Sequence, residues 1–386
     1  YGNYVFVGVR QAGKSYLLYQ RIQQLLANGV EIENIVYVNF DDERLQGMTV
    51  TDFDLILQAY HSMYDSQPIF FFDEIQNVEG WANFARRLAN QKYRVYITGS
   101  NAKMLSRDIE TVLGGRYLDI SVFPYSFSEY LKAVGVLVSK NWQYGRKANE
   151  LQRHFRTYFE WGGFPELVHF QEKRVWLNSL YNRIFFNDLV VRHKVKNEDA
   201  LRLCVRRLAE SVKQPCSLNR LSNLIKATGT PCSPSTVMEY VRYLQESCLL
   251  ISIDNYVSKF VEKETIKKHY FVDNGLLHLF INNPNTSLLE NLCTITLYKK
   301  YGKGLYYYNR NIEVDFYVPD EGLAVQASYQ MSDEETIERE AKALVTLHGL
   351  YPLKRAMIIT YEDEGEIVRE GLKIEIKPAW KWVMEG

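Results

Sequence analysis

The sequence predicts an α/β protein whose N-terminal part is a mostly parallel sheet covered by helices. Three observations lead to this prediction: apolar, strand-like runs alternate with amphipathic helical segments, a glycine-rich loop follows the first run, and two acids end the third. Strands that alternate with helices are joined by right-handed crossovers into parallel sheets. We therefore expect an open sheet with its ligand site at the carboxyl ends of the strands.

The glycine-rich loop runs from Gly8 to Ser15 and fits the pattern G-x-x-x-x-G-K-[ST]. It follows the apolar run 4–7 and precedes a helical segment that we expect to end near Ala27. Such a loop curls at its glycines and turns backbone N–H groups towards phosphate oxygens, and the helix N-terminus adds its positive dipole end. Lys14 would reach the β- and γ-phosphates, and Ser15 would ligate Mg²⁺. The residues expected at the nucleotide are Gly8, Arg10, Gln11, Ala12, Gly13, Lys14, Ser15 and Tyr16.

The alternative interpretation of this loop, a glycine turn with an exposed lysine, is disfavoured by a second motif. The apolar run 68–72 ends in Asp73 and Glu74. An apolar run of this length suits a central parallel strand that is covered on both faces. Asp73 would then hold Mg²⁺ through water, and Glu74 would polarise an attacking water. The alternative here is a strand that ends in two solvated acids.

Two further strands complete the pattern. Residues 34–40 read as a strand that ends at three acids, for which a solvated loop is the favoured interpretation. Residues 93–101 read as a fourth strand with a polar end. Helices are expected at 53–64 and 81–88, between these strands.

The paired acids, the extra strand between the two motifs and the polar strand end at 98–101 together resemble an AAA+-type ATPase. The resemblance implies ATP and Mg²⁺ as cofactors. It also implies that Ser100 and Asn101 help to orient the attacking water. The alternative for these two residues is a turn with local side-chain hydrogen bonds.

A Gly-Gly-Arg stretch at 114–116 and the motif Pro-x-Ser-Phe-x-Glu from Pro124 resemble a prokaryotic group of AAA-type ATPases. In that group the ATPase is fused to a C-terminal domain of unknown function. Arg116 would stabilise charge, in cis or towards a neighbouring subunit, or would form a plain salt bridge. The stretch 161–166, Trp-Gly-Gly-Phe-Pro-Glu, is similar to the same group and lies in an expected helical lid at 131–199.

Residues 200–272 read as a winged-helix domain. Helices are expected at 201–212, at 218–225 and from Ser233, which would cap the third helix. The following hairpin is expected at 257–268, with four lysines against two glutamates, a local charge of 4 − 2 = +2. A DNA-binding wing and a protein-packing domain both stay open, and the weakly charged outer face of the third helix favours the second.

The last part, residues 273–386, reads as a separate α/β unit that is similar to the PD-(D/E)XK nuclease fold. The resemblance places the metal-binding and catalytic positions of that fold at Glu290, Asp315, Gln326 and Ser328. Gln326 is neutral, and Ser328 stands where active members carry a lysine. We therefore expect a degenerate restriction-endonuclease-like domain that is kept for structure or recognition.

Composition limits the partners of this chain. Its 386 residues include 46 basic and 46 acidic side chains, so no global basic field argues for nucleic acid. Five scattered cysteines without a C-x-x-C pair indicate reduced thiols and a cytoplasmic protein. No apolar run approaches the roughly 20 residues of a membrane span.

The expected organisation is thus a P-loop ATPase domain at 1–130, a helical lid at 131–199, a winged-helix domain at 200–272 and a nuclease-like domain at 273–386. We expect MgATP hydrolysis that moves the last two domains. The alternative is a slow, ATP-gated switch that acts on a protein or DNA partner. An oligomer is compatible with either.

Overall fold

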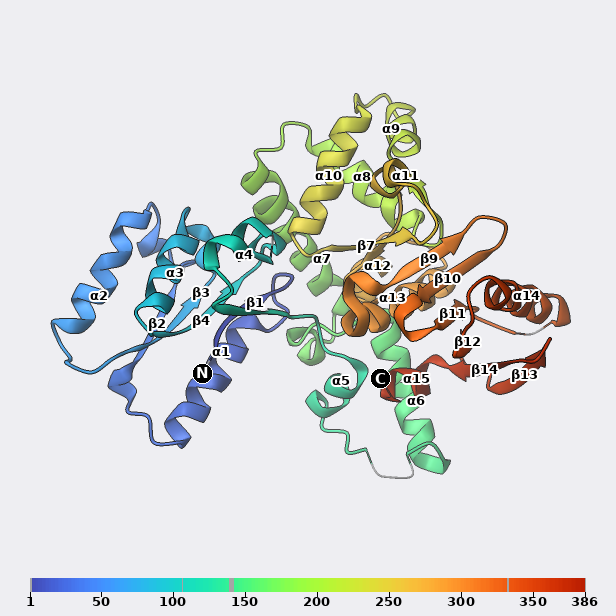
Figure 1. Ribbon diagram of the computed structural model, residues 1–386, viewed down its shortest axis with the longest axis horizontal. Helices are drawn as coiled ribbons and strands as arrows, with labels where there is room; N and C mark the ends of the chain where they lie inside the picture. The colour runs from blue at the N-terminus through green and yellow to red at the C-terminus, as the bar shows by residue number, and fades with distance from the viewer. Residues whose placement is uncertain (1, 106, 139–141, 332, 386) are drawn as a thin grey trace. The chain divides into compact units, whose positions relative to one another are not determined.

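The computed structural model describes residues 2–105, 107–138, 142–331 and 333–385 (Figure 1). The chain divides into two compact units. The first unit contains the residues up to Phe123 together with Glu246–Cys248. The second unit contains residues 124–245 and 249–386.

The first unit is built on a five-stranded sheet, coloured blue to teal in Figure 1. Its strand order is β2-β3-β4-β1-β5, and every neighbouring pair is parallel. This confirms the predicted parallel α/β sheet. The strands are β1 (Asn3–Val7), β2 (Ile35–Asn39), β3 (Ile69–Asp73), β4 (Arg94–Gly99) and β5 (Tyr117–Ser121). The helices are α1 (Lys14–Ala27), α2 (Phe53–His61), α3 (Trp81–Asn90) and α4 (Arg107–Leu113).

Strand β3 forms the centre of this unit because it is covered on both faces. Phe70, Phe71 and Phe72 are all fully buried. Phe70 and Phe72 pack in one hydrophobic cluster with Phe84 of α3, while Phe71 packs in a second cluster with Leu18 of α1. Successive side chains of a strand point to opposite faces, so three consecutive aromatic residues need a helix on each side.

The second unit begins with helices. They are α5 (Phe127–Ala133), α6 (Gly145–Trp161), α7 (Lys173–Arg183), the π-helix η7 (Ile184–Val191), α8 (Glu198–Glu210), α9 (Leu218–Lys226) and α10 (Pro234–Glu246). The starts of α9 and α10 follow side-chain caps: Ser217 Oγ accepts from Arg220 N–H and Ser233 Oγ from Thr236 N–H.

The hairpin after α10 differs from the expected one at 257–268. Its strands are β7 (Leu250–Asn255) and β8 (Ile266–Phe271), and the helix α11 (Phe260–Thr265) lies between them. The strands begin earlier because the alternating residues Ile251 and Ile253 are buried. Lys268, expected on an exposed wing, pairs with Ile253 in this ladder and is fully buried.

The same hairpin continues into the C-terminal sheet. Strand β7 pairs in parallel with β9 through Asp254 and Asn255. The resulting sheet has nine strands in the order β13-β14-β12-β11-β10-β9-β7-β8-β6. Its other strands are β6 (Cys216–Ser217), β9 (Tyr306–Asn309), β10 (Glu313–Val318), β11 (Leu323–Ala327), β12 (Arg355–Thr360), β13 (Gly365–Arg369) and β14 (Leu372–Pro378).

Two long helices accompany this sheet. Helix α14 (Glu334–Leu350) is amphipathic and packs Leu344 and Leu347 against Ile358 and Ile374 of the sheet. Helix α13 (Asn285–Tyr301) is buried nearly all round, as a central helix must be. Two short helices, α12 (Asn274–His278) and α15 (Ala379–Glu385), complete the unit.

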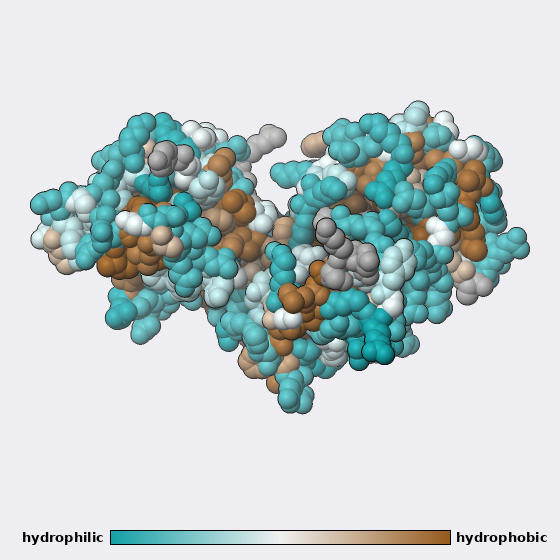
Figure 2. Space-filling view, turned by 90° about the horizontal axis from the view of Figure 1, so that it is seen from below, coloured by the Kyte–Doolittle hydropathy of each residue, from teal (hydrophilic) through white to brown (hydrophobic). Residues whose placement is uncertain are grey.

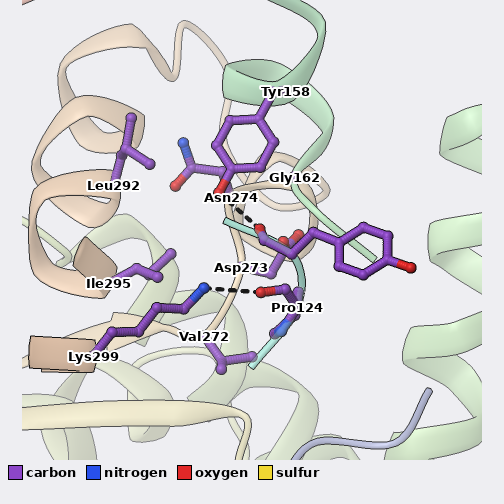
Figure 3. A pocket seen from close by; sticks show the side chains of 10 residues that line it. Pro124, Tyr158, Gly162, Val272, Asp273, Asn274, Leu292, Ile295 and Lys299 are labelled. Carbon is purple, nitrogen blue, oxygen red and sulfur yellow. Dashed lines mark hydrogen bonds between the residues drawn. The ribbon is translucent and has the colours of Figure 1, made fainter. Parts of the chain in front are cut away.

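The motif that begins at Pro124 and the motif at 161–166 meet at a small pocket around Asp273, within the second unit (Figure 3). The Asp273 carboxylate accepts hydrogen bonds from the N–H groups of Gly163 and Gly275, both at 2.8 Å. A Cβ on Gly162, whose φ is 78°, would lie 1.9 Å from Asp273 Oδ1. The Gly-Gly pair therefore lets the backbone approach a buried carboxylate. Across the pocket, Lys299 donates to the carbonyl of Pro124 at 2.9 Å.

Hydrophilic residues cover most of the face shown in Figure 2, between smaller apolar patches. Among the described residues, no helix is long and apolar enough to cross a membrane.

We predict that His269 makes the second unit acid-sensitive. This side chain is buried and lies 2.8 Å from Ser252 Oγ, and burial together with Lys267 lowers its pKa from 6.5 to about 4. The folded state therefore favours the neutral ring, so stability is full above about pH 6.5 and is lost as the pH falls towards 4. The loss should reach about 2 kcal/mol at about pH 5.

Urea unfolding of the second unit across this pH range, for the wild type and His269→Gln, measures the effect. The difference in free energy of unfolding between the two proteins should change by that amount. A difference that stays constant with pH would contradict the prediction.

Candidate nucleotide site

The loop between β1 and α1 has the backbone shape that its glycines predict. Gly13 caps α1 with a φ of 101°. Gly8 donates to the Gly99 carbonyl at 3.3 Å, and a Cβ on Gly8 would lie 1.9 Å from the carbonyl oxygen of Val122. Ala12 N–H closes the turn on the Val9 carbonyl at 3.2 Å. The close approach at Gly8 and the positive φ of Gly13 thus both favour a residue without a Cβ, and the N-terminus of α1 directly follows this loop.

Lys14 is the one residue of this loop with a buried charge. Its side chain is 3% exposed, and its ammonium lies 3.2 Å from the Val9 carbonyl and 3.4 Å from Glu74 Oε1. Arg10 lies at the edge of the loop, 3.8 Å from Asp41. Ser15 is half-buried on the first turn of α1, and Tyr16 beside it is 63% exposed. Gln11 adopts a left-handed conformation with a φ of 61°.

The carboxylate of Asp73, at the end of β3, is held by two hydroxyl groups. Thr98 donates to Oδ1, and Tyr37 donates to Oδ2 at 2.8 Å. Tyr19 extends this chain, with its hydroxyl 3.0 Å from that of Tyr37. Burial, the hydrogen bond with Tyr19 and the charge of Asp73 all raise the pKa of Tyr37, so the phenol keeps its proton and remains a donor. The orientation of Asp73 is thus fixed before any ligand arrives.

Glu74 occupies a strained backbone position with a φ of 52°. Its N–H donates to Thr98 Oγ1 at 3.0 Å, and its Oε2 accepts from Gln76 Nε2 at 2.6 Å. Burial would raise the pKa of Glu74, but Lys14 and the hydrogen bonds to Gln76 and Ser100 bring it below its ordinary value. The carboxylate is therefore ionised at neutral pH, as a general base must be.

The remaining predicted residues fall into two groups. Ser100 is buried and its Oγ accepts from Gln76 Nε2 at 3.3 Å, so it joins the Glu74 side of the site. Asn101 accepts from Lys103 N–H at 2.9 Å, a local turn contact. Arg116 is exposed and its described hydrogen bond goes to the Gly114 carbonyl. The structure brings Ser100 to Glu74 and shows only local contacts for Asn101 and Arg116.

Ser15 and Asp73 fit the way Mg²⁺ enters such a site. Mg²⁺ keeps several waters and takes its other ligands from one or two protein oxygens and the substrate phosphates. Within the described ranges, no group of three His, Cys, Asp or Glu side chains forms a metal cage. A hydroxyl and a pre-oriented carboxylate are sufficient for a metal that is bound together with a nucleotide.

Sequence reasoning missed three residues of this site: Tyr37, Gln76 and Thr98. Thr98 lay within the polar strand end, and its pairing with Asp73 follows from the β3–β4 register. Tyr37 could have been found from the β2–β3 pairing, since it lies two residues before the end of its strand.

The C-terminal positions also come together, in the second unit. Glu290 of α13 and Asp315 of β10 share contacts with the buried ammonium of Lys268. Gln326 of β11 accepts from Asp315 N–H at 2.7 Å. Ser328 donates to the Gln330 carbonyl at 3.3 Å. Lys268, which the sequence placed on a wing, is thus a member of this cluster.

Comparison with known proteins agrees with this architecture. A family described as an AAA domain matches residues 2–131, and a domain of unknown function matches residues 152–287. The chain is 32% identical to the uncharacterized protein MJ1544 of Methanocaldococcus jannaschii, over 98% of this chain and 87% of that protein. The chain belongs to the same protein family. An AAA-type domain followed by a domain of unknown function is thereby confirmed. The match to the second domain, at 152–287, lies mainly in the segments expected as lid and winged helix, rather than at 273–386, where that domain was expected.

The family extends to bacteria. An uncharacterized protein of Haemophilus influenzae is 31% identical over 97% of this chain and 93% of its own length. Among solved structures, a Walker-type ATPase of Pyrococcus abyssi matches at 13% identity with a TM-score of 0.42, over 72% of this chain and 91% of that one. The ORC1 protein of Aeropyrum pernix, solved with DNA, matches at 16% identity with a TM-score of 0.35, over 75% and 87% of the two chains.

We predict that Lys14→Ala weakens ATP binding at least about 100-fold, because charge-assisted contacts to two phosphates are worth about 3 kcal/mol together. Calorimetric titration with MgATP measures the change. Lys303→Ala, which removes an exposed lysine of the second unit, is the matched control and should bind as the wild type does. Equal affinity of Lys14→Ala and the control would refute the assignment of this loop.

Proposed function

We propose that the first unit binds MgATP in the loop between β1 and α1 and hydrolyses it with Glu74 as the base. The observation that carries the proposal is the 3.4 Å contact between the buried Lys14 ammonium and Glu74. It places the phosphate-binding cation and the ionised carboxylate side by side at the carboxyl edge of a parallel sheet, where ligands of such sheets bind.

Each residue has a role in this proposal. Lys14 binds the β- and γ-phosphates, together with the N–H groups that begin α1. Ser15 and Asp73 hold Mg²⁺, the second of them through water. Glu74 accepts a proton from the attacking water. Gln76 donates hydrogen bonds to both Glu74 and Ser100. In this proposal Gln76 and Ser100 orient the attacking water and do not react themselves.

Nucleotide binding would rearrange one contact above all. The Lys14 ammonium lies 3.4 Å from Glu74 Oε1 in this structure. A γ-phosphate carries more charge than the carboxylate and would take Lys14 as its partner. Glu74 would then be released from Lys14 and directed to water, so the same event binds the substrate and frees the base.

We predict that Glu74→Gln lowers the rate of ATP hydrolysis by about 100-fold or more while MgATP still binds, because loss of a positioned general base costs about 10²–10⁴ in rate. Steady-state phosphate release and calorimetry measure the two effects. Glu79→Gln is the matched control, since Glu79 is an exposed glutamate five residues further on. Unchanged turnover in Glu74→Gln would remove Glu74 from the mechanism.

A second candidate function is a slow, ATP-gated switch, which would use the same contact between Lys14 and Glu74. In this alternative ATP binding, rather than its turnover, changes the affinity of the protein for a partner.

The partner of such a switch is better described as a protein than as DNA. Of the four lysines at 257–268, Lys268 is buried and Lys267 lies 3.0 Å from Asp254. The two that remain, Lys259 and Lys263, face two glutamates on the same segment, so 2 − 2 leaves no net charge. A neutral hairpin lacks the phosphate contacts on which nucleic-acid affinity depends.

We therefore predict that double-stranded DNA changes the ATP turnover of the wild type by less than about twofold, because no counterions would be released from such a surface. The measurement is steady-state phosphate release at low salt, with and without DNA. Stimulation that is absent in Glu74→Gln would instead indicate a DNA-coupled ATPase.

Arg116 is exposed, and we propose a role for it only towards a second subunit.

A further inference from the structure

The second unit contains a fully buried ammonium group that the nucleotide site does not use. Lys268 of β8 has a side-chain exposure of 0%. Its Nζ lies 3.2 Å from Glu290 Oε1, 3.0 Å from Glu313 Oε1 and 3.1 Å from Asp315 Oδ1. These carboxylates come from helix α13 and strand β10. Three carboxylates from two elements thus converge on one cation within hydrogen-bond distance.

The surrounding atoms are already committed to hydrogen bonds. Glu290 Oε1 also accepts from the Tyr270 hydroxyl at 2.7 Å, and Asp315 Oδ2 accepts from Ala327 N–H at 3.1 Å. Gln326 Oε1 accepts from Asp315 N–H, and its Nε2 donates to Glu340 Oε2 at 2.9 Å. The oxygen of Gln326, which would face a metal in the resembling fold, is therefore used within the protein.

Electrostatics make this ammonium necessary. Glu290 and Asp315 are largely buried, with 6% and 16% of their side chains exposed, whereas Glu313 is 44% exposed. Buried carboxylates without a cation carry a large desolvation cost. One positive charge must therefore be present among them for this part of the fold to be stable.

We propose that Lys268 is the built-in cation of this site: its ammonium takes the position that a divalent metal ion would otherwise occupy among Glu290, Glu313 and Asp315. The second unit then needs no metal ion and takes none up, and the cluster joins β8 to α13 and β10 as a structural centre. The proposal is independent of ATP hydrolysis in the first unit.

The proposal makes a gain-of-function prediction. Removing the ammonium in Lys268→Ala leaves three carboxylates around an empty position, which is the oxygen-rich environment that Mg²⁺ and Mn²⁺ prefer. This variant should bind one more equivalent of Mn²⁺ than the wild type, with a Kd of about 0.1–1 mM. The double variant Lys268→Ala/Asp315→Asn should lose that equivalent. Lys267→Ala is the matched control, since it removes the neighbouring lysine, which pairs with Asp254 at the surface.

The experiment is a Mn²⁺ titration of the full chain without nucleotide, followed by electron paramagnetic resonance of the free ion. The first unit is the same in all four proteins, so any Mn²⁺ that it binds is the same in each and cancels in the comparison. A folded Lys268→Ala protein that gains no Mn²⁺ would overturn the proposal. If that variant does not fold, Mn²⁺ binding by the wild type and by Asp315→Asn tests the proposal instead. We expect the two proteins to bind the same number of Mn²⁺ equivalents. An equivalent that the wild type binds and Asp315→Asn loses would show a metal site beside Lys268 and refute the proposal.

Discussion

The contact between Lys14 and Glu74 is the interaction on which the proposed function of the first unit depends. A buried ammonium must have a partner, and in this structure its partners are the Glu74 carboxylate at 3.4 Å and the Val9 carbonyl at 3.2 Å. Both side chains lie where the glycine loop and the end of β3 meet, because Phe70–Phe72 anchor that strand between two hydrophobic clusters. The packing of the sheet therefore sets the geometry of the charge pair, and the charge pair prepares the site for a phosphate.

Lys14 and Lys268, the two lysines that are buried in the described part of the chain, illustrate how the surroundings of a cation decide its use. Lys14 lies at the end of the glycine loop, beside the N-terminus of α1, and its described carboxylate partner is Glu74. In the proposed function a phosphate takes the place of that carboxylate. Lys268 has three carboxylate partners, held further by Tyr270 and Gln326, so no ligand group is required. The Lys14 site is thus suited to exchanging its carboxylate partner for a phosphate, whereas the Lys268 cluster is suited to a permanent structural role.

The parts of this account that sequence reasoning predicted are those encoded by neighbouring residues. The glycine loop, the paired acids and the strand–helix alternation are local patterns, and they located the parallel sheet and the edge where Lys14 and Glu74 lie. Contacts between distant segments were missed: Tyr37 reaches Asp73 through strand pairing, and Lys268 reaches Glu290 across 22 residues. The hairpin at 257–268 was misplaced because its charged residues suggested an exposed wing, whereas burial of Ile251 and Ile253 sets the register.

The most direct test of the account is a crystal structure of the chain with Mg²⁺ and a non-hydrolysable ATP analogue. We expect the Lys14 ammonium on the β- and γ-phosphates, Mg²⁺ beside Ser15 with Asp73 one water away, and Glu74 separated from Lys14 and directed to a water near the γ-phosphate. A complex in which Lys14 keeps its contact with Glu74, and the phosphates lie elsewhere, would contradict the central claim that this charge pair lies in a nucleotide site.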